Sequence, residues 1–467
     1  MAVETVRWRE SVALPRMVAA AAHPVVRPAS RAIENLVLVL FWLLIFEGSL
    51  RKWLLPEYSR WLFFVRDPFL LILYWQAARA RAWRDAGPLL WAGSALAVLA
   101  VMVAFTQSIS FGDPRMLPML IYGWRQYFLY LPLPFVLAAT VDRAFLVRFT
   151  RHAIAAVVLT APLVVIEYGS PGSSVLNRGS AEDAALQFQS FDLLGEHIRP
   201  SGFFTTNIGV KELLSSTAAL LFAFWLMPVA GRGMRLPWLL CGAAGVATCL
   251  ALSGSRAAFV HMAIVVLAAL GVGFVTRSGA VRARALTIPL LLCLAGAILY
   301  PLVFPGALQT MLERVANANA FESQHSSLGI LGRALSEYVE FLQRIGTTPL
   351  LGWGLGLGGN GRTFLGDTSA LPLAQIAAES EWTRHVVDLG VVGLLFILYR
   401  IVFVLVLLWR ALHATRVARS PLPLMLFGYV GIVLLNGQMT GQGTVGGFAW
   451  LYVGLCMASC RVAMEER

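Results

Sequence analysis

The chain has 467 residues, of which 58% are hydrophobic and 13% are charged, and its mean hydropathy is +0.71. These values exclude an ordinary soluble protein and indicate a polytopic membrane protein. The net charge of +12 does not indicate nucleic-acid binding, because the basic residues are spread over short loops between apolar stretches instead of gathering on one face.

Apolar stretches of transmembrane length run through the whole chain. A helix needs about 20 apolar residues to cross a bilayer, and the candidates are residues 33–48, 61–77, 88–107, 118–140, 151–168, 207–229, 236–253, 257–275, 285–304, 385–409, 421–437 and 445–462. The loops between them are alternately rich and poor in arginine, and the positive-inside rule assigns the arginine-rich loops and both termini to the cytoplasm. The sequence therefore predicts an all-α, multi-pass membrane protein with about 12 transmembrane helices.

These helices and loops divide the chain into four predicted regions. The segment 305–384 is expected to form one large extracytoplasmic, or periplasmic, loop, in which 309–321 and 332–345 have the periodicity of amphipathic helices. The regions are a cytoplasmic basic tail (1–32), transmembrane helices 1–9 with a periplasmic loop at 169–206 (33–304), the large periplasmic loop (305–384), and transmembrane helices 10–12 with a cytoplasmic tail (385–467).

The second predicted span contains the charged sequence Arg66-Asp67-Pro68. A charge inside a membrane segment is costly unless it is paired or reaches water. We expect Arg66 and Asp67 either to neutralise each other or to line a cavity. Arg400, within the tenth predicted span, is expected to pair inside the protein.

Features that often mark cofactor sites do not carry that meaning in this chain. The five cysteines lie in or beside apolar stretches, without the spacing of a zinc site. The glycine-rich segment 352–359 lacks the Lys-Ser/Thr ending of a P-loop and is predicted to be a structural turn. We therefore expect neither a metal nor another cofactor.

Four groups of polar residues fall on the extracytoplasmic side. The positive-inside rule explains arginines on the cytoplasmic side only, so the arginines in these groups need another explanation. A guanidinium group binds phosphate oxygens through two parallel hydrogen bonds and stays charged. Arginines at this boundary therefore suit a lipid-linked pyrophosphate, and neighbouring carboxylates suit a general base. The groups are Arg199-Pro200-Ser201-Gly202-Phe203-Phe204 with Lys211, Ser253-Gly254-Ser255-Arg256, Glu379-Ser380-Glu381-Trp382-Thr383-Arg384-His385, and Glu47 with Arg51 and Lys52.

Three of these groups also have a plainer explanation. Arg199 and Arg256 suit arginines whose side chains reach from a helix end to the membrane–water boundary. The acidic residues of the third group suit solvated loop carboxylates, and His385 suits a packed histidine. Lys211 is harder to explain without a function, because it lies inside a predicted span.

Four short motifs follow one another between about residues 195 and 400. They are Arg199-x-x-Gly202-Phe203, Ser253-Gly254-Ser255-Arg256, Pro349-Leu350-Leu351-Gly352-Trp353-Gly354-Leu355-Gly356 and Gly390-Val391-Val392-Gly393-Leu394. In this order the chain resembles the O-antigen ligase and O-antigen polymerase superfamily of bacterial inner-membrane glycosyltransferases. The first half of the chain, with Phe46-Glu47-Gly48 and Arg66-Asp67-Pro68, matches only in topology.

The resemblance implies a GT-C-like helical fold in the bacterial inner membrane. It implies a donor glycan on undecaprenyl pyrophosphate, a glycan or lipid acceptor, transfer in the periplasm, and no metal or nucleotide sugar. It also implies that Arg199 and Arg256 bind the pyrophosphate, and we add Lys211 and Arg384 as auxiliary cations.

The expected catalytic base departs from the pattern of this superfamily. Its ligases usually carry a catalytic histidine before the Gly-x-x-Gly signature, and the position eleven residues before Gly390 is Glu379. Glu381 and His385 lie close by in the sequence. We therefore take Glu379, Glu381 and His385 as the candidate catalytic residues, and this departure favours a polymerase or an uncharacterised relative over a ligase.

Two functions of other classes remain open. A secondary transporter would use about 12 helices, with Arg66, Asp67 and Lys211 along its path, although the hydropathy shows no six-plus-six symmetry. A non-catalytic protein of envelope polysaccharide assembly is the third hypothesis. The partners expected on the leading hypothesis are the lipid-linked donor, the acceptor and membrane lipids, without nucleic acid.

Overall fold

The computed structural model describes residues 31–84, 86–112, 116–178, 198–228, 233–325, 338–359, 378 and 380–466. Within these residues the chain forms helices and no strand, which confirms the all-α prediction for this part. The helices are α1 (Arg31–Ser49), η2 (Leu50–Leu54), η3 (Pro56–Tyr58), α2 (Ser59–Leu62), α3 (Asp67–Arg79), α4 (Pro88–Phe111), α5 (Met116–Trp124), η4 (Arg125–Leu129), α6 (Leu133–Thr140), α7 (Arg143–Gly169), η5 (Val175–Asn177), α8 (Asn207–Leu226), α9 (Leu236–Leu252), α10 (Arg256–Val275), α11 (Gly279–Val303), α12 (Pro305–His325), α15 (Glu381–Leu389), α16 (Val391–Ala418), α17 (Leu422–Asn436) and α18 (Gly443–Glu465).

Several of these helices have the length and composition of membrane spans. Among the described residues, eight helical segments are long and apolar enough to cross a membrane. They are Arg31–Leu54, Pro88–Ser110, Arg143–Gly169, Asn207–Leu226, Arg256–Val275, Gly279–Val303, Val391–Ala418 and Gly443–Glu465. The fold is therefore that of a multi-pass membrane protein.

Four other predicted spans differ from long single helices. Helices α9 and α17 are apolar but have only 17 and 15 residues. The predicted span 61–77 contains α3, which has 13 residues and begins at Asp67 with Pro68 in its first turn, where proline is tolerated but the preceding helix is interrupted. The predicted span 118–140 is divided between α5, η4 and α6.

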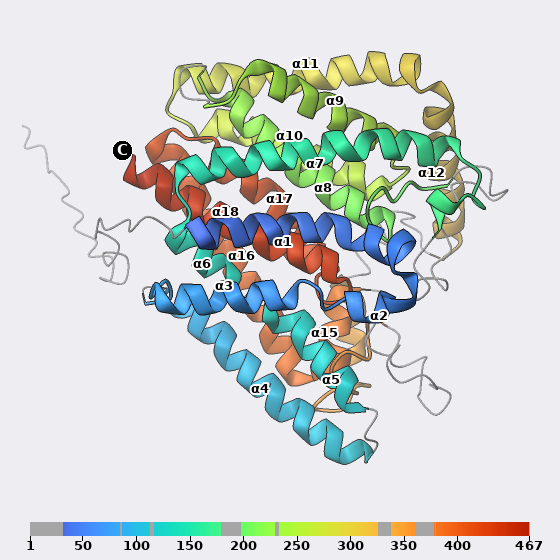
Figure 1. The fold of residues 1–467 in the computed structure, drawn as a ribbon, viewed down its shortest axis with the longest axis vertical. Helices are drawn as coiled ribbons and strands as arrows, with labels where there is room; N and C mark the ends of the chain where they lie inside the picture. The colour runs from blue at the N-terminus through green and yellow to red at the C-terminus, as the bar shows by residue number, and fades with distance from the viewer. Residues whose placement is uncertain are drawn as a thin grey trace, which may run out of the picture.

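The helices form a bundle around α18, as Figure 1 shows. Helix α18 packs against α6, α16 and α17, and 89% of its apolar window is buried, whereas only 6% of the α11 window is buried. Helix α11 lies along one edge of the bundle and α4 along the opposite edge (Figure 1). A helix that is apolar on all sides and unburied is suited to face lipid, so α11 belongs to the lipid-facing surface.

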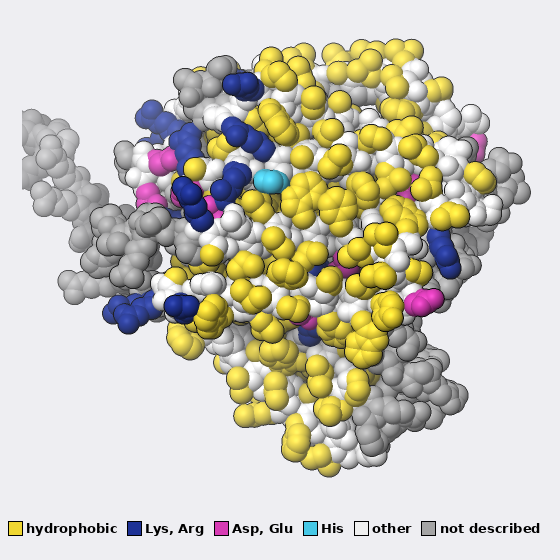
Figure 2. Space-filling model, in the orientation of Figure 1, with side chains coloured by type: hydrophobic (Ala, Val, Ile, Leu, Met, Phe, Trp, Pro, Cys, Tyr) yellow, Lys and Arg dark blue, Asp and Glu magenta, His cyan; other side chains and the backbone are white. Residues whose placement is uncertain are grey.

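Basic side chains gather at one end of the bundle (Figure 2). At this end Arg143, the first residue of α7, pairs with Glu466 after α18 at 2.6 Å. Arg148 of α7 pairs with Glu34 in the first turn of α1. The arginine-rich segments that the sequence assigns to one membrane side therefore meet in space at the starts of α1 and α7 and the end of α18.

The large loop is described only in part. The helix predicted at 309–321 lies within α12, and residues 338–345 are helical as well. The tenth span starts later than predicted, at Val391 instead of residue 385, because Gly390 adopts a positive φ of 59° and separates α15 from α16. His385 therefore belongs to a short helix that precedes the span.

Candidate active site

Helix α15 places three of the predicted site residues next to one another. Ser380 caps its first turn by accepting a hydrogen bond from the Thr383 N–H (3.1 Å). At the other end, the turn at Gly390 folds α15 back against the start of α16. A Cβ atom at Gly393 would collide with the carbonyl oxygen of His385. This second glycine of the Gly-x-x-Gly signature is therefore required for the close packing of α15 on α16.

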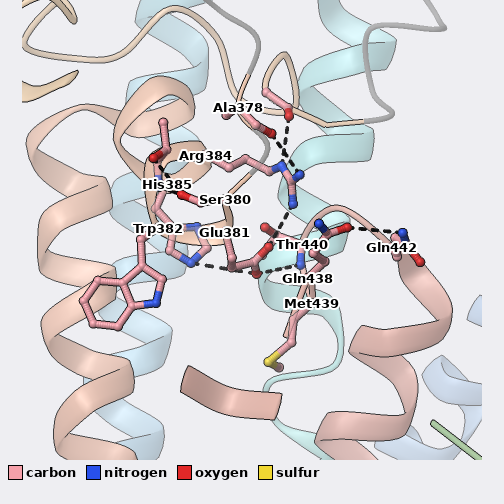
Figure 3. Close-up of polar contacts among 12 residues, drawn as sticks. Ala378, Ser380, Glu381, Trp382, Arg384, His385, Gln438, Met439, Thr440 and Gln442 are labelled. Carbon is pink, nitrogen blue, oxygen red and sulfur yellow. Dashed lines mark hydrogen bonds and ion pairs between the residues drawn. The ribbon is translucent and has the colours of Figure 1, made fainter. Parts of the chain in front are cut away.

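Glu381 lies at the centre of a buried charge network (Figure 3). Its Oε1 atom accepts hydrogen bonds from Arg400 Nη1 (3.1 Å) and from the Thr440 backbone N–H (2.9 Å). Its Oε2 atom accepts one from Arg384 Nη1 at 2.9 Å. Two guanidinium groups thus compensate the charge of one carboxylate, and both of its oxygens are occupied as acceptors. This environment suits a residue that holds arginines better than one that accepts a proton.

His385 is also fully engaged. Arginine has no hydrogen-bond acceptor, so Arg400 Nη1 must donate to His385 Nε2, at 2.6 Å. The ring proton then sits on Nδ1 and is donated to Tyr127 Oη at 3.0 Å. Tyr127 in turn donates to Asp388 Oδ2 (3.1 Å), and Asp388 Oδ1 accepts the Gly358 N–H (2.7 Å). The chain of bonds fixes a neutral histidine and ties α15 to the glycine-rich segment.

Arg384 connects α15 with two loops. Besides Glu381, its guanidinium donates to the carbonyl oxygens of Gly358 (2.9 Å) and Ala378 (3.2 Å). A Cβ atom at Gly441 would collide with the same guanidinium. Because all three of its nitrogens have protein partners, Arg384 holds loops together here and would have to exchange a bond to contact a substrate.

The glycine-rich segment 352–359 forms a buried turn beneath α15. Gly352, Gly354 and Gly356 have φ values of 81°, 154° and 97°, which other residues rarely adopt. The Gln107 side chain donates to the Leu351 and Asp388 carbonyl oxygens and accepts the Leu355 N–H. The segment is thus a turn held by side chains from α4 and α15, as predicted. Glu379 and residues 360–377 lie outside the described residues.

The Arg199 motif is anchored by a second buried ion pair. Lys52 of η2 lies 3.3 Å from Glu167 near the end of α7, and both side chains are fully buried. Lys52 also donates to Ser201 Oγ (2.7 Å) and the Gly202 carbonyl oxygen (3.0 Å). Glu167 accepts the Gly202 N–H at 2.7 Å. The pair therefore binds the backbone of the loop on both sides of Gly202.

Neighbouring residues of the first-half motif complete this anchor. Ser49 donates to the Phe203 carbonyl oxygen at 3.0 Å, and the rings of Phe46 and Phe203 lie 5.1 Å apart. A Cβ atom at Gly48 would collide with the Phe203 carbonyl oxygen. The segment from Phe46 to Lys52 therefore supports the Arg199 motif. The sequence analysis named Lys52 but missed Glu167, whose position inside the apolar stretch 151–168 was the available signal.

Arg199 itself is half-buried, and its Nε atom is buried without a hydrogen-bond partner among the described residues. A buried, charged N–H without an acceptor costs free energy. The anchored loop therefore presents a donor that an anionic ligand would satisfy.

Lys211 and Arg256 lie at the starts of two further helices. Lys211 of α8 pairs at 2.8 Å with the buried Glu212, which also accepts a hydrogen bond from Tyr429. Arg256 is the first residue of α10 and is half-buried, and Arg314 of α12 donates to the Gly254 carbonyl oxygen at 2.6 Å. Arg314 is a further cation at this turn, and the sequence analysis missed it.

The pairing of Arg66 and Asp67 is a correction to the sequence analysis. Arg66 Nε lies 2.7 Å from Glu47 Oε2, while Arg125 binds both Asp67 oxygens at 2.5 and 2.7 Å. Arg51 approaches the other Glu47 oxygen at 3.6 Å. The two neighbours thus do not neutralise each other, because their side chains leave the start of α3 toward different helices.

The segment between α17 and the start of α18 connects two groups of charged residues, Glu47 with Arg51 and Arg66, and Glu381 with Arg384 and Arg400. Arg66 Nη1 donates to the Gly443 carbonyl oxygen at 3.2 Å, while Thr440 binds Glu381. The structure thus brings Glu381, Arg384 and His385 together. Among the described residues, no hydrogen bond or ion pair joins Arg199 or Lys211 to them.

Comparison with known proteins adds no relative: no family model and no curated protein matches this chain. The resemblance to the O-antigen ligase and polymerase superfamily therefore rests on the short motifs alone.

Proposed function

We propose that this protein is a bacterial inner-membrane glycosyltransferase that transfers or polymerises a glycan carried on undecaprenyl pyrophosphate, in surface polysaccharide biosynthesis. The observation that supports this most is the anchored Arg199 loop. A buried Lys52–Glu167 pair holds the loop rigidly, and the loop presents a guanidinium nitrogen that lacks a partner among the described residues. A guanidinium at a membrane boundary suits a lipid-linked pyrophosphate.

The proposed site lies on the periplasmic side. Arg199, Lys211 and Arg256 precede or open helices whose other ends carry the arginine-rich loops, so the positive-inside rule favours a periplasmic position for them. About 12 crossings, counting α3, α9, α17 and the divided segment α5–α6, keep both termini in the cytoplasm. A GT-C-like architecture belongs to this proposal as well.

In the proposed reaction, the hydroxyl oxygen of the acceptor attacks the anomeric carbon of the donor sugar. The bond from this carbon to the pyrophosphate oxygen breaks, and the hydroxyl proton passes to a carboxylate base. Arg199 and Arg256 stabilise the charge of the leaving pyrophosphate, which is the larger expected effect. Lys211 and Arg384 are auxiliary cations. To bind the pyrophosphate, each would first give up a contact with a protein carboxylate, Glu212 or Glu381.

Glu379 is the preferred base among the three candidates. The Glu381 carboxylate accepts three hydrogen bonds, two of them from guanidinium groups. Both ring nitrogens of His385 have partners as well. We therefore assign Glu381 and His385 to positioning Arg384 and Arg400, and keep the proton-accepting role for Glu379.

The rival transporter hypothesis gains less support. Arg66, Asp67 and Lys211 were its candidate path, and each lies in a close ion pair with Glu47, Arg125 or Glu212. A translocation path would have to break these pairs during each cycle. A non-catalytic role in envelope polysaccharide assembly is the remaining alternative.

Deletion of the gene, followed by analysis of surface polysaccharide and of lipid-linked glycans, tests the proposal. Accumulation of a single lipid-linked repeat identifies a polymerase, and accumulation of full-length lipid-linked polymer identifies a ligase. Unchanged length and attachment of the polysaccharide, with no accumulated lipid-linked glycan, would contradict both forms.

A further inference from the structure

A depression of about 830 Å³ lies between the N-terminal ends of α1 and α7, on the arginine-rich end of the molecule. It is far from the candidate active site, since both helices lead from here to the opposite end, where Lys52 and Glu167 lie. Its charged lining residues are Arg31, Glu34, Asp142, Arg143, Arg148 and Arg151.

The positive charge of this depression is only partly compensated. Arg148 pairs with Glu34, and Arg143 pairs with Glu466. Asp142 is occupied as the cap of α7, where it accepts the N–H of the third helical residue at 2.7 Å. Four arginines thus face three carboxylates, and two helix N-termini add positive partial charge.

Two of the arginines are available for an anion. Arg31 and Arg151 are exposed and make no ion pair with a described carboxylate; Arg151 donates to the Gly233 carbonyl oxygen at 3.0 Å. In the same lining, the Arg148 Nε atom is buried without a hydrogen-bond partner among the described residues. The depression therefore holds unused guanidinium donors.

The depression borders an apolar surface. Further along both helices from the charged lining, Trp42 of α1 donates a hydrogen bond to His152 Nδ1 of α7 at 3.1 Å and so joins the two helices. Val39 of α1, between the depression and this contact, and Leu159 of α7, beyond the contact, are both exposed. Figure 2 shows the basic side chains directly beside the broad apolar surface. A ligand with a charged head and apolar chains fits both parts.

We propose that this depression binds the phosphate-containing headgroup of an anionic phospholipid, with Arg31 and Arg151 as its principal contacts and the acyl chains along α1 and α7. Basic pockets between transmembrane helices recognise such headgroups, and each arginine near an anionic membrane surface contributes about fivefold to the binding constant. The proposal is independent of the glycosyltransferase function, because it uses none of that site's residues.

The test measures cardiolipin binding to the purified full-length protein in neutral detergent by native mass spectrometry. The wild-type protein should bind cardiolipin more tightly than phosphatidylcholine with the same acyl chains. The Arg31→Gln/Arg151→Gln variant should lose about 25-fold in affinity for the first cardiolipin bound, two factors of about fivefold. An excess of inorganic phosphate should not displace the lipid, because phosphate lacks the acyl chains.

The matched control is Arg410→Gln/Arg416→Gln. It removes two exposed arginines near the C-terminal end of α16, which do not line the depression. It should keep wild-type affinity. An equal loss in both double variants, equal binding of the two lipids, or displacement by phosphate would each overturn the proposal. Thermal unfolding without added lipid checks the fold. If the double variant unfolds at a lower temperature than the wild-type protein, the single variant Arg31→Gln should show the fivefold loss of cardiolipin affinity.

Discussion

The ammonium group of Lys52 lies 3.3 Å from the Glu167 carboxylate, and both side chains are fully buried although 115 residues separate them in the chain. This pair links η2 to the end of α7 and holds the Ser201 hydroxyl and the Gly202 backbone between them. The proposed pyrophosphate-binding loop thus depends on residues of the first half of the chain.

Replacing Lys52 should destabilise the protein strongly. Lys52→Met leaves the Glu167 carboxylate buried without its cation, which typically costs about 3–5 kcal/mol. Lys52→Met/Glu167→Gln removes the uncompensated charge and keeps an acceptor for the Gly202 N–H. The double variant should therefore unfold at a higher temperature than Lys52→Met alone, measured on purified protein in detergent. Equal unfolding temperatures for the two variants would argue against a buried ion pair.

The arginines at the proposed pyrophosphate site should be essential for glycan transfer. Arg199→Ala and Arg256→Ala should abolish transfer at normal expression, and Arg256→Lys should restore little, because an ammonium group does not reproduce two-pronged phosphate binding. The readouts are surface polysaccharide in cells and transfer by the reconstituted protein. Arg410→Ala, at the arginine-rich end, is the control. Near-normal polysaccharide in both alanine variants would contradict pyrophosphate binding by Arg199 and Arg256. The two side chains would then only reach to the membrane–water boundary.

The base assignment predicts different effects for two neighbouring glutamates. Glu379→Gln should reduce transfer by about 100- to 10,000-fold, the usual contribution of a general base, with unchanged thermal stability and donor binding. Glu381→Gln should lower the unfolding temperature, because Arg384 and Arg400 lose their shared carboxylate.

His385→Ala is the third variant in this series and should also lower stability. If Glu379→Gln stays active while one of the other two variants is inactive but stably folded, the base is that other residue. Full activity in all three variants would refute the proposed acid–base mechanism.

The packing of α15 on α16 should tolerate no side chain at Gly393. A Cβ atom there collides with the His385 carbonyl oxygen, so Gly393→Ala must move the helices apart, at a cost of about 1–3 kcal/mol or more. Gly296→Ala in α11 is the matched control, since nothing lies within 4 Å of its Cβ position. There the better helix propensity of alanine should leave stability unchanged or raise it by about 0.5–1 kcal/mol. Similar unfolding temperatures for both variants would contradict the described contact.

Reporter fusions should define the membrane topology. Fusions after Arg84, Arg148, Arg235, Arg284 and Arg416 should report the cytoplasm, and fusions near Glu182 and Gly361 should report the periplasm. A cytoplasmic signal at Gly361 would separate the large loop from a donor on the periplasmic face and would remove the basis of the proposed mechanism.

Local sequence was sufficient to predict most helices. A membrane span is a property of contiguous apolar residues, so hydropathy found α4, α7, α8, α10, α11, α16 and α18. The same reasoning was less accurate where charges and prolines interrupt a span, as before α3 and between α5 and α6. It also placed Glu381, Arg384 and His385 in one group because they are close in sequence, and the structure adds that all three belong to the short helix α15.

The partners of the charged residues were decided only by the tertiary structure. Arg66 is adjacent to Asp67 in sequence, yet it pairs with Glu47, while Asp67 pairs with Arg125 from another segment. Glu381 likewise binds Thr440, which is 59 residues away. A buried charge takes the oppositely charged partner that helix packing brings within hydrogen-bond distance. Hydropathy and charge patterns report which segments are buried and on which side of the membrane they end, but they contain no information on which of these segments lie next to one another.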